Sequence, residues 1–242
     1  MSSAASSSRQ FAWRNTGAAT PPSEIARLAH ARGALVHTDA AQSTGKIATD
    51  VNALGADLLS VAGHKLYAPK GVGGLFVRRG TPIHPLLLGA GHECGLRPGT
   101  ENVASILGLG RACDVAFRDL QAEATRVRAL RHSLWDRLFA AIPGLALNGH
   151  PVERLPDTIN IRFPGVRGSA VLAKANQIAA SVGSACHEGG ESASPVLLAM
   201  GIEEQQALGS VRLSLGRMTS EHEIQLAAQI LTDALGATGC GG

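Results

Sequence analysis

The most constraining feature of this chain is a pair of short apolar stretches, each followed by a chemically reactive residue. The first stretch, at 34–38, ends directly before Asp39, and the second, at 57–62, is followed by Gly63-His64-Lys65. Short apolar runs bounded by turn residues are typical of buried strands. A helical pattern precedes the first run, and this order of helix then strand predicts an α/β layer. We expect the two runs to be neighbouring strands.

An acid and a lysine at the ends of neighbouring strands suit a bound pyridoxal 5'-phosphate. The cofactor needs a lysine amine that holds it as a Schiff base, which Lys65 can supply. It also needs a carboxylate against its pyridine nitrogen, so that the ring stays protonated and accepts electrons. Asp39 is the candidate for that second role.

Composition excludes several other functions for this chain of 242 residues. A net charge of +3, with no basic run interleaved with aromatic residues, argues against nucleic acid as a partner. No apolar stretch approaches the roughly 20 residues of a membrane-spanning helix. Four cysteines without a CxxC pair indicate a reducing compartment, and hence the cytoplasm. An organelle such as the mitochondrion is the alternative, because Arg9 and Arg14 come before the first acid, Glu24.

The order of the patterns divides the chain into two parts. Residues 1–20 are typical of a disordered or irregular start, and residues 21–117 alternate helix with strand, as in an α/β domain. A helical pattern at 102–141 has a charge-rich middle, which favours a solvated helix that crosses between domains. Residues 118–242 mix strands with helices and predict a smaller C-terminal α+β domain with a cysteine on a turn.

Two local patterns in the second part make specific predictions. The stretch 157–163 alternates apolar with polar residues, which predicts a half-buried strand. Ser220 and Glu223 have the spacing of a capping box, which predicts that the last helix begins there.

Six spaced strings carry a resemblance to a known family. They are HTDAAQSTGK (37–46), GHK (63–65), YAPKGVGGLFVRRG (67–80), GHECGLRPGTEN (91–102), SVGSACHE (181–188) and VRLSLGRMTS (211–220). From about Pro21 to Ala234 the chain resembles the cysteine desulfurase and selenocysteine lyase branch of the class V aminotransferases. GHK alone would be a weak signal, but six strings in the same order are specific. The resemblance implies part of a fold type I transferase, whose large α/β domain has a mixed, mostly parallel sheet.

The resemblance also implies a role for each cofactor-binding candidate. Lys65 would form the Schiff base and later move the α-proton of the substrate, while Asp39 would contact the pyridine nitrogen. Gln42 would hydrogen-bond the phenolic oxygen of the cofactor, and His64 its phosphate. Thr100 would reach the phosphate of a neighbouring subunit's cofactor, which implies a homodimer. Without the resemblance, Lys65 would be interpreted as a surface lysine, Asp39 as a turn residue and His64 as a half-buried histidine.

Two residues of the second part would act on the substrate. Cys186 stands on a turn after Gly183 and would attack the sulfur of bound L-cysteine, leaving a persulfide on the enzyme and releasing L-alanine. Arg212 would bind the substrate carboxylate with its two-pronged guanidinium. A desulfurase of this kind supplies sulfur for iron–sulfur clusters or other thio-cofactors, so a sulfur-acceptor or scaffold protein is an expected partner.

Three alternatives stay open beside a cysteine desulfurase. A selenocysteine lyase uses the same cofactor, lysine and cysteine, and converts selenocysteine to alanine and selenide. A truncated, non-catalytic interaction module is the second alternative, and transamination is the third, although it has no use for a thiol at Cys186. We also considered metal binding by His92, Glu93 and Cys94, and we reject it because no second cluster of ligands accompanies them.

The chain departs from the family pattern at several places. Family chains carry a further segment before the helix that starts near Pro22, with the phosphate-binding turn and the histidine that stacks on the ring. Trp13-Arg14-Asn15 replaces Asn-Asn-Glu, Ala62 replaces a phosphate-binding serine, and Cys94 replaces an arginine. We therefore expect a truncated product, or a partner chain that completes the sheet.

Overall fold

The described part of the chain folds into two compact units. The computed structural model describes residues 6–10, 16, 22–182 and 192–239. The units meet in the chain between Leu120 and Gln121, near the boundary expected between residues 117 and 118, and Thr16 belongs with the second unit. The long helix α3 (Val103–Ala141) begins in the first unit and ends in the second.

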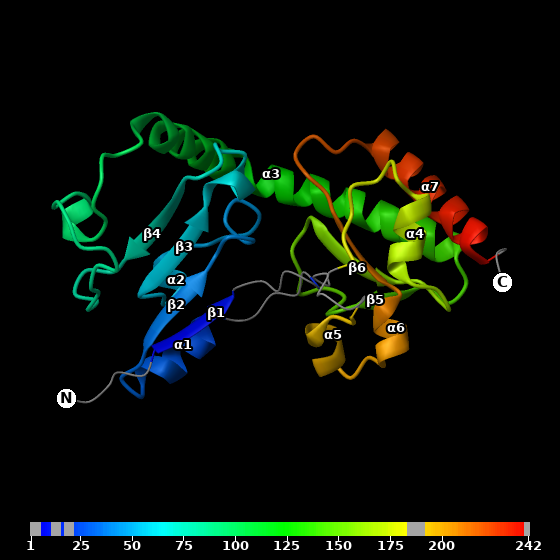
Figure 1. The fold of residues 1–242 in the computed structure, drawn as a ribbon, viewed down its shortest axis with the longest axis horizontal. Coiled ribbons are helices and arrows are strands. Elements are labelled where there is room, and N and C mark those ends of the chain that lie inside the picture. The colour runs from blue at the N-terminus through cyan, green and yellow to red at the C-terminus, as the bar shows by residue number, and fades with distance from the viewer. Residues whose placement is uncertain (1–5, 11–15, 17–21, 183–191, 240–242) are drawn as a thin grey trace. The chain divides into compact units, whose positions relative to one another are not determined.

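A four-stranded mixed sheet forms the centre of the first unit (Figure 1). Its strands follow one another in chain order: β1 (Ser6–Gln10), β2 (Leu35–Asp39), β3 (Leu58–Ala62) and β4 (Gly73–Val77). The first three run parallel, and β4 returns antiparallel to β3. The prediction of an α/β layer with a mixed, mostly parallel sheet is confirmed.

The expected irregular start is wrong at one place, because residues 6–10 form β1. This strand pairs with β2 over its whole length, from Ser6 opposite Leu35 to Gln10 opposite Asp39. A run of serine, arginine and glutamine has no strand pattern of its own. Strand pairing uses backbone groups, however, so a polar segment can occupy an edge that a neighbouring strand offers.

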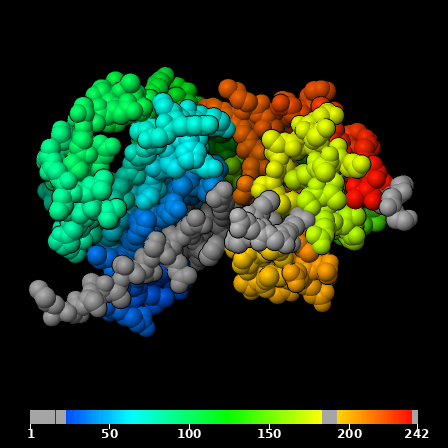
Figure 2. Space-filling view, viewed as in Figure 1, coloured from blue at the N-terminus to red at the C-terminus, as the bar shows by residue number. Residues whose placement is uncertain are grey.

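A short helix or 3-10 turn follows each strand of the first unit. These elements are α1 (Pro22–His30), α2 (Val51–Leu54) and the 3-10 turns η1 (Gly63–Leu66) and η2 (Glu93–Gly95). A small apolar cluster of Ala40, Leu54, Ala56 and Leu59 joins α2 to the sheet. The stretch 81–102 makes a loop on the surface of this unit (Figure 2), and three consecutive leucines in it, Leu86 to Leu88, are exposed.

The second unit is a two-layer structure of helices on a three-stranded antiparallel sheet. The strands, in the order β5-β6-β7, are β5 (Ala146–Asn148), β6 (Thr158–Arg162) and β7 (Ser210–Ser214). The helices are α4 (Gly168–Lys174), α5 (Pro195–Ala199), α6 (Glu204–Leu208) and α7 (Glu221–Gly239). The prediction of an α+β part agrees with these elements, but the part is not the smaller one, since the second unit covers residues 13–19 and 121–242 and the first covers 1–12 and 20–120.

The main core lies between one face of this sheet and three helices. Strand residues at odd positions, such as Ile159, Ile161 and Val211, pack against Leu138 of α3 and Leu231 of α7. Burial of such side chains contributes about 1.5–3 kcal/mol each relative to exposure.

On β6 the polar residues Thr158 and Asn160 are buried as well as the apolar ones, which corrects the prediction of a half-buried strand. Asn160 on β6 is 1% exposed, as is Asn148 on β5. The reason is hydrogen bonding, because the Asn148 amide donates to the Asn160 side chain at 2.7 Å and so satisfies both groups away from water.

Across the described residues, every helix is too short or too polar to span a lipid bilayer.

Candidate functional site

The turn after β2 presents Asp39 at the carboxyl end of the sheet. Asp39 is the last residue of β2 and is half-buried. Its Oδ1 accepts the backbone N–H of Ala41 at 2.9 Å, as is common for an aspartate that begins a turn. The backbone of Ala40 donates to the Ser60 carbonyl at 3.0 Å, which ties the turn to β3. Gln42 lies half-buried in the same turn.

A close backbone contact fixes the turn that carries Lys65. Gly63 begins η1 directly after β3, and its N–H donates to the Val72 carbonyl at 3.0 Å. A Cβ on Gly63 would stand 2.6 Å from that oxygen, so this position requires glycine. Tyr67 ends η1 in the left-handed region, with φ 63°. Lys65 is half-buried on this turn, and His64 beside it is exposed.

The sheet brings these two turns together. β2 and β3 are adjacent and parallel, with Asp39 opposite Ser60, so both turns leave the sheet at the same edge. Ligands of open α/β sheets bind at this edge, outside the carboxyl ends of the strands. Asp39, Gln42, His64 and Lys65 therefore belong to one end of one sheet.

One polar contact and one unpaired hydroxyl at this edge were not anticipated from the sequence. His37 Nε2 lies 2.7 Å from Ser60 Oγ, between β2 and β3. His37 is two residues before Asp39, and this spacing places both on one face of a strand, a signal that was present in the sequence. Thr44 Oγ1 is buried with no hydrogen-bond partner among the described residues, in the same turn as Gln42.

Thr100 lies apart from this group along the chain and in local structure. It is exposed on the loop between η2 and α3, whereas Asp39 and Lys65 are half-buried at the carboxyl ends of β2 and β3. His92, Glu93 and Cys94 surround η2, and within the described ranges no cluster of three or more His, Cys, Asp or Glu could hold a metal.

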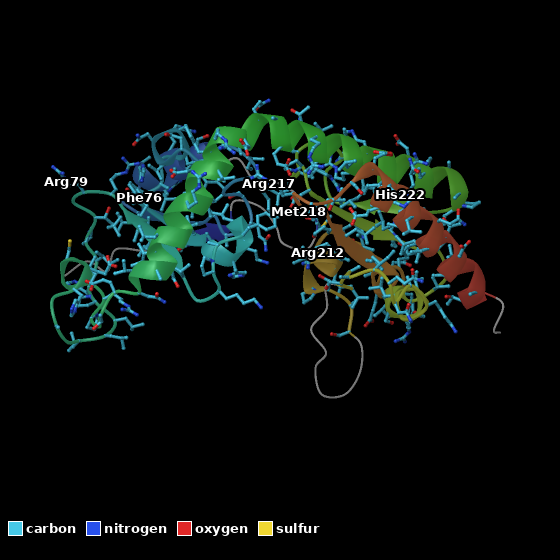
Figure 3. The ribbon with its side chains drawn as sticks, turned by 90° about the horizontal axis from the view of Figure 1, so that it is seen from above. Phe76, Arg79, Arg212, Arg217, Met218 and His222 are labelled. Atoms are coloured by element: carbon cyan, nitrogen blue, oxygen red, sulfur yellow. The ribbon has the colours of Figure 1, made fainter. Side chains whose placement is uncertain are left out.

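Arg212 stands at the middle of β7 in the second unit (Figure 3). Its backbone pairs with Ser181 through two hydrogen bonds, of 2.7 Å and 3.2 Å. The side chain is half-buried on the polar face of the sheet, opposite Asn160. Cys186 follows soon after Ser181 in sequence and lies outside the described residues.

Of the two cysteines within the described residues, Cys113 does not compete with Cys186 as a reactive thiol. Partial burial and the neighbouring Asp114 carboxylate raise the pKa of the Cys113 thiol above its ordinary value. A raised pKa disfavours the thiolate, which is the nucleophilic form. Cys94 is exposed beside η2, with φ 57°.

The α/β fold and the residues at the edge of the first sheet are those expected of a pyridoxal phosphate-dependent protein. Sequence comparison gives the same class. The family model described as aminotransferase class-V matches residues 12–226. The chain therefore belongs to the class V aminotransferase family, whose members depend on pyridoxal phosphate.

Individual relatives show which members of the family the chain is similar to. Cysteine desulfurase NifS of Azotobacter vinelandii is 47% identical over 216 residues, which are 88% of this chain and 54% of the relative. Cysteine desulfurase 2 of Trichormus variabilis is 42% identical over 226 residues, which are 93% of this chain and 56% of the relative. The chain thus spans about half the length of the curated relatives it matches.

Solved structures give the same fold. A NifS-like protein superposes with a TM-score of 0.87 at 32% identity, covering 97% of this chain and 62% of its own. A NifS-like protein from Rickettsia africae superposes with a TM-score of 0.85 at 27% identity, covering 95% of this chain and 61% of its own. The predicted fold, part of a fold type I transferase, is confirmed.

Proposed function

We propose that this chain carries the cofactor lysine and the thiol of a pyridoxal phosphate-dependent cysteine desulfurase. The reaction removes sulfur from L-cysteine, giving L-alanine and a persulfide on Cys186. The observation that supports it best is the shared edge of β2 and β3, where Asp39 and Lys65 leave adjacent parallel strands. The identity of 47% to a cysteine desulfurase adds weight to the same reaction.

The residues at this edge fit the cofactor in their chemistry. A carboxylate, a lysine amine and an amide match the pyridine nitrogen, the aldehyde and the phenolic oxygen of pyridoxal phosphate. The buried Thr44 hydroxyl, which has no partner among the described residues, leaves a polar atom at this edge for a further contact. We assign the phosphate to His64, and to Thr100 of a neighbouring subunit.

Each residue would have one task in the reaction. When bound, pyridoxal phosphate withdraws electrons from the substrate's Cα. The Lys65 amine holds the aldehyde and then moves the α-proton, while the Asp39 carboxylate stabilises the protonated pyridine nitrogen. Arg212 binds the substrate carboxylate. The Cys186 thiolate attacks the substrate sulfur, so that a new S–S bond forms as the C–S bond breaks and alanine leaves.

Reconstitution tests the cofactor assignment. Pyridoxal phosphate added to the purified chain should produce a visible absorption band, and borohydride should fix the cofactor mass on the peptide that contains Lys65. Lys65→Ala should lose both signals, whereas Lys70→Ala, at an exposed lysine five residues on, should keep them. A band unchanged in Lys65→Ala would reject the proposal.

A second assay separates desulfuration from other chemistry. With L-cysteine, the reconstituted chain should form alanine and a persulfide, and Cys186→Ala should abolish both while keeping the absorption band. Unchanged product formation in Cys186→Ala would favour transamination or elimination. Faster turnover of selenocysteine than of cysteine would favour a selenocysteine lyase.

One observation favours a second candidate, a non-catalytic interaction module. The chain spans 54% and 56% of two desulfurase relatives, so it matches only part of the length of proteins that carry this activity. A normal fold without any persulfide formation, even with cofactor bound, would support this candidate over the enzyme.

We also propose a homodimer and a reducing compartment, with the cytoplasm preferred to an organelle. Leu86 and Leu88 on the surface loop are 95% and 89% exposed, which supports burial against another chain. A sulfur-acceptor or scaffold protein is the further partner that a persulfide on Cys186 would require.

A further inference from the structure

The polar face of the second sheet carries two arginines side by side. Asn160 on β6 is opposite Arg212 on β7, and Arg162 is opposite Ser210, so Arg162 and Arg212 are diagonal neighbours on adjacent strands. Diagonal neighbours in an antiparallel pair lie about 7–8 Å apart, within reach of long side chains. Both arginines are half-buried.

A set of hydrogen bonds, here called the clamp and formed by Asn148, Asn160 and Ser210, holds Arg162 in place. Its Nη1 donates to Asn148 Oδ1 at 3.0 Å. An arginine has only donors, so its partner on Asn148 must be the oxygen, and the Asn148 nitrogen is left to donate. That nitrogen donates to Asn160 Oδ1 at 2.7 Å and to Ser210 Oγ at 2.9 Å. Every member of the clamp comes from the sheet itself.

The clamp is neutral, so it does not balance the charge of Arg162. Among the described residues, no group accepts a hydrogen bond from Arg162 Nε or Nη2, and no carboxylate pairs with it. The even positions of the three strands, which form this face, contain no acid: Ala146, Asn148, Thr158, Asn160, Arg162, Ser210, Arg212 and Ser214. Arg162 is thus a half-buried cation without a carboxylate partner among the described residues, and such a cation attracts an anion.

We propose that Arg162 is a second carboxylate-binding residue, which acts beside Arg212 on the α-carboxylate of the amino-acid substrate. This assignment rests on the proposed function, because it takes an amino acid as the ligand. Guanidinium groups bind carboxylates through paired, charge-assisted hydrogen bonds, and the clamp pre-orients one of the two groups. Asn148 is then a positioning residue that acts through Arg162.

Binding to the cofactor-free chain tests this directly. The side-chain Nε–H resonances of 15N-labelled arginines are followed by NMR while L-alanine is added at constant ionic strength. L-alanine should shift the Arg162 and Arg212 signals along one saturating curve, and L-alaninamide, which lacks the carboxylate, should not. Arg162→Gln should raise the Kd about tenfold, and Arg128→Gln, at an exposed arginine of α3, should leave it within twofold.

Three outcomes would overturn the assignment. They are an Arg162→Gln affinity within twofold of the parent chain, an equal response to L-alaninamide, and the absence of any saturating shift. Should Arg162→Gln fail to fold, Asn148→Asp is the second variant, since it adds an internal carboxylate for Arg162 and should also weaken L-alanine binding. The Lys65 absorption band reports the cofactor site in the other unit, so its loss with intact L-alanine binding would reject the proposed function alone.

Discussion

At the scale of single residues, Asp57 shows how a buried charge is stabilised at the start of β3. Its Oδ2 accepts the Val36 backbone N–H at 2.8 Å and lies 2.8 Å from His30 Nε2. Burial on its own raises the pKa of this carboxyl. The hydrogen bonds from His30 and Val36, with the charges of His30 and Arg78, outweigh burial, so that the net pKa lies below its ordinary value.

The lowered pKa of Asp57 predicts an acid-sensitive contribution to stability. Because the folded state binds the proton less tightly than the unfolded chain, this contribution is present above the unfolded pKa of about 3.9 and is lost as the pH falls below it. Asp57→Asn should lower the free energy of unfolding by roughly 1–3 kcal/mol at pH 7. The difference from the parent chain should shrink in acid, which urea unfolding at pH 7 and pH 3 would measure.

The matched control for this prediction is Glu24→Gln, at an exposed acid on α1. It should show no comparable dependence on pH. A gap between Asp57→Asn and the parent chain that is equal at both pH values would contradict the role assigned to Asp57.

At the scale of elements, local sequence patterns and tertiary contacts each decided part of the structure. The capping box formed as predicted, with the Ser220 N–H donating to Glu223 at 2.7 Å and the Glu223 N–H donating to Ser220 Oγ at 3.2 Å. Ser220 directly precedes α7, which begins at Glu221. By contrast, α4 ends at Lys174, and a turn follows it in which the Ile178 N–H donates to the Ala175 carbonyl at 3.0 Å. Ser181 then pairs with Arg212 of β7, a contact between residues far apart in the sequence.

The junction of β3 with η1 gives a prediction about the cofactor lysine. In Gly63→Ala the new methyl group would meet the Val72 carbonyl at 2.6 Å, and backbone cannot move aside cheaply. We expect a loss of about 1–3 kcal/mol in stability and a weaker absorption band on reconstitution, because the turn that carries Lys65 must shift. Gly74→Ala is the control, since its Cβ would meet nothing within 4 Å. Equal bands in the two variants would contradict this account.

At the scale of the whole molecule, each unit has its own apolar cluster, and the two differ in size. The first unit buries a small cluster that includes Leu54 and Leu59, and its strand β4 leaves Leu75 and Phe76 exposed. The second unit buries a larger cluster between its sheet and helices. The exposed apolar side chains of the first unit fit the proposed association with another chain.

Self-association supplies the prediction at this scale. The double change Leu86→Ser with Leu88→Ser should shift the mass found by sedimentation velocity from a dimer toward a monomer, because both leucines lose the apolar surface that an interface would bury. Leu226→Ser, at a 48% exposed leucine on α7 of the second unit, is the control and should leave the mass unchanged. A monomeric parent chain would contradict the proposed dimer.

The sequence by itself indicated the candidate chemistry and most of the elements along the chain. Asp39 and Lys65 follow apolar runs, Ser220 and Glu223 cap a helix, and these are patterns of neighbouring residues. Only the tertiary structure decided that residues 6–10 pair with β2, and that the Asn148 side chain hydrogen-bonds with those of Asn160 and Arg162. Those contacts join residues far apart in sequence. Their free energy comes from backbone pairing and from hydrogen bonds shielded from water, which no local pattern records.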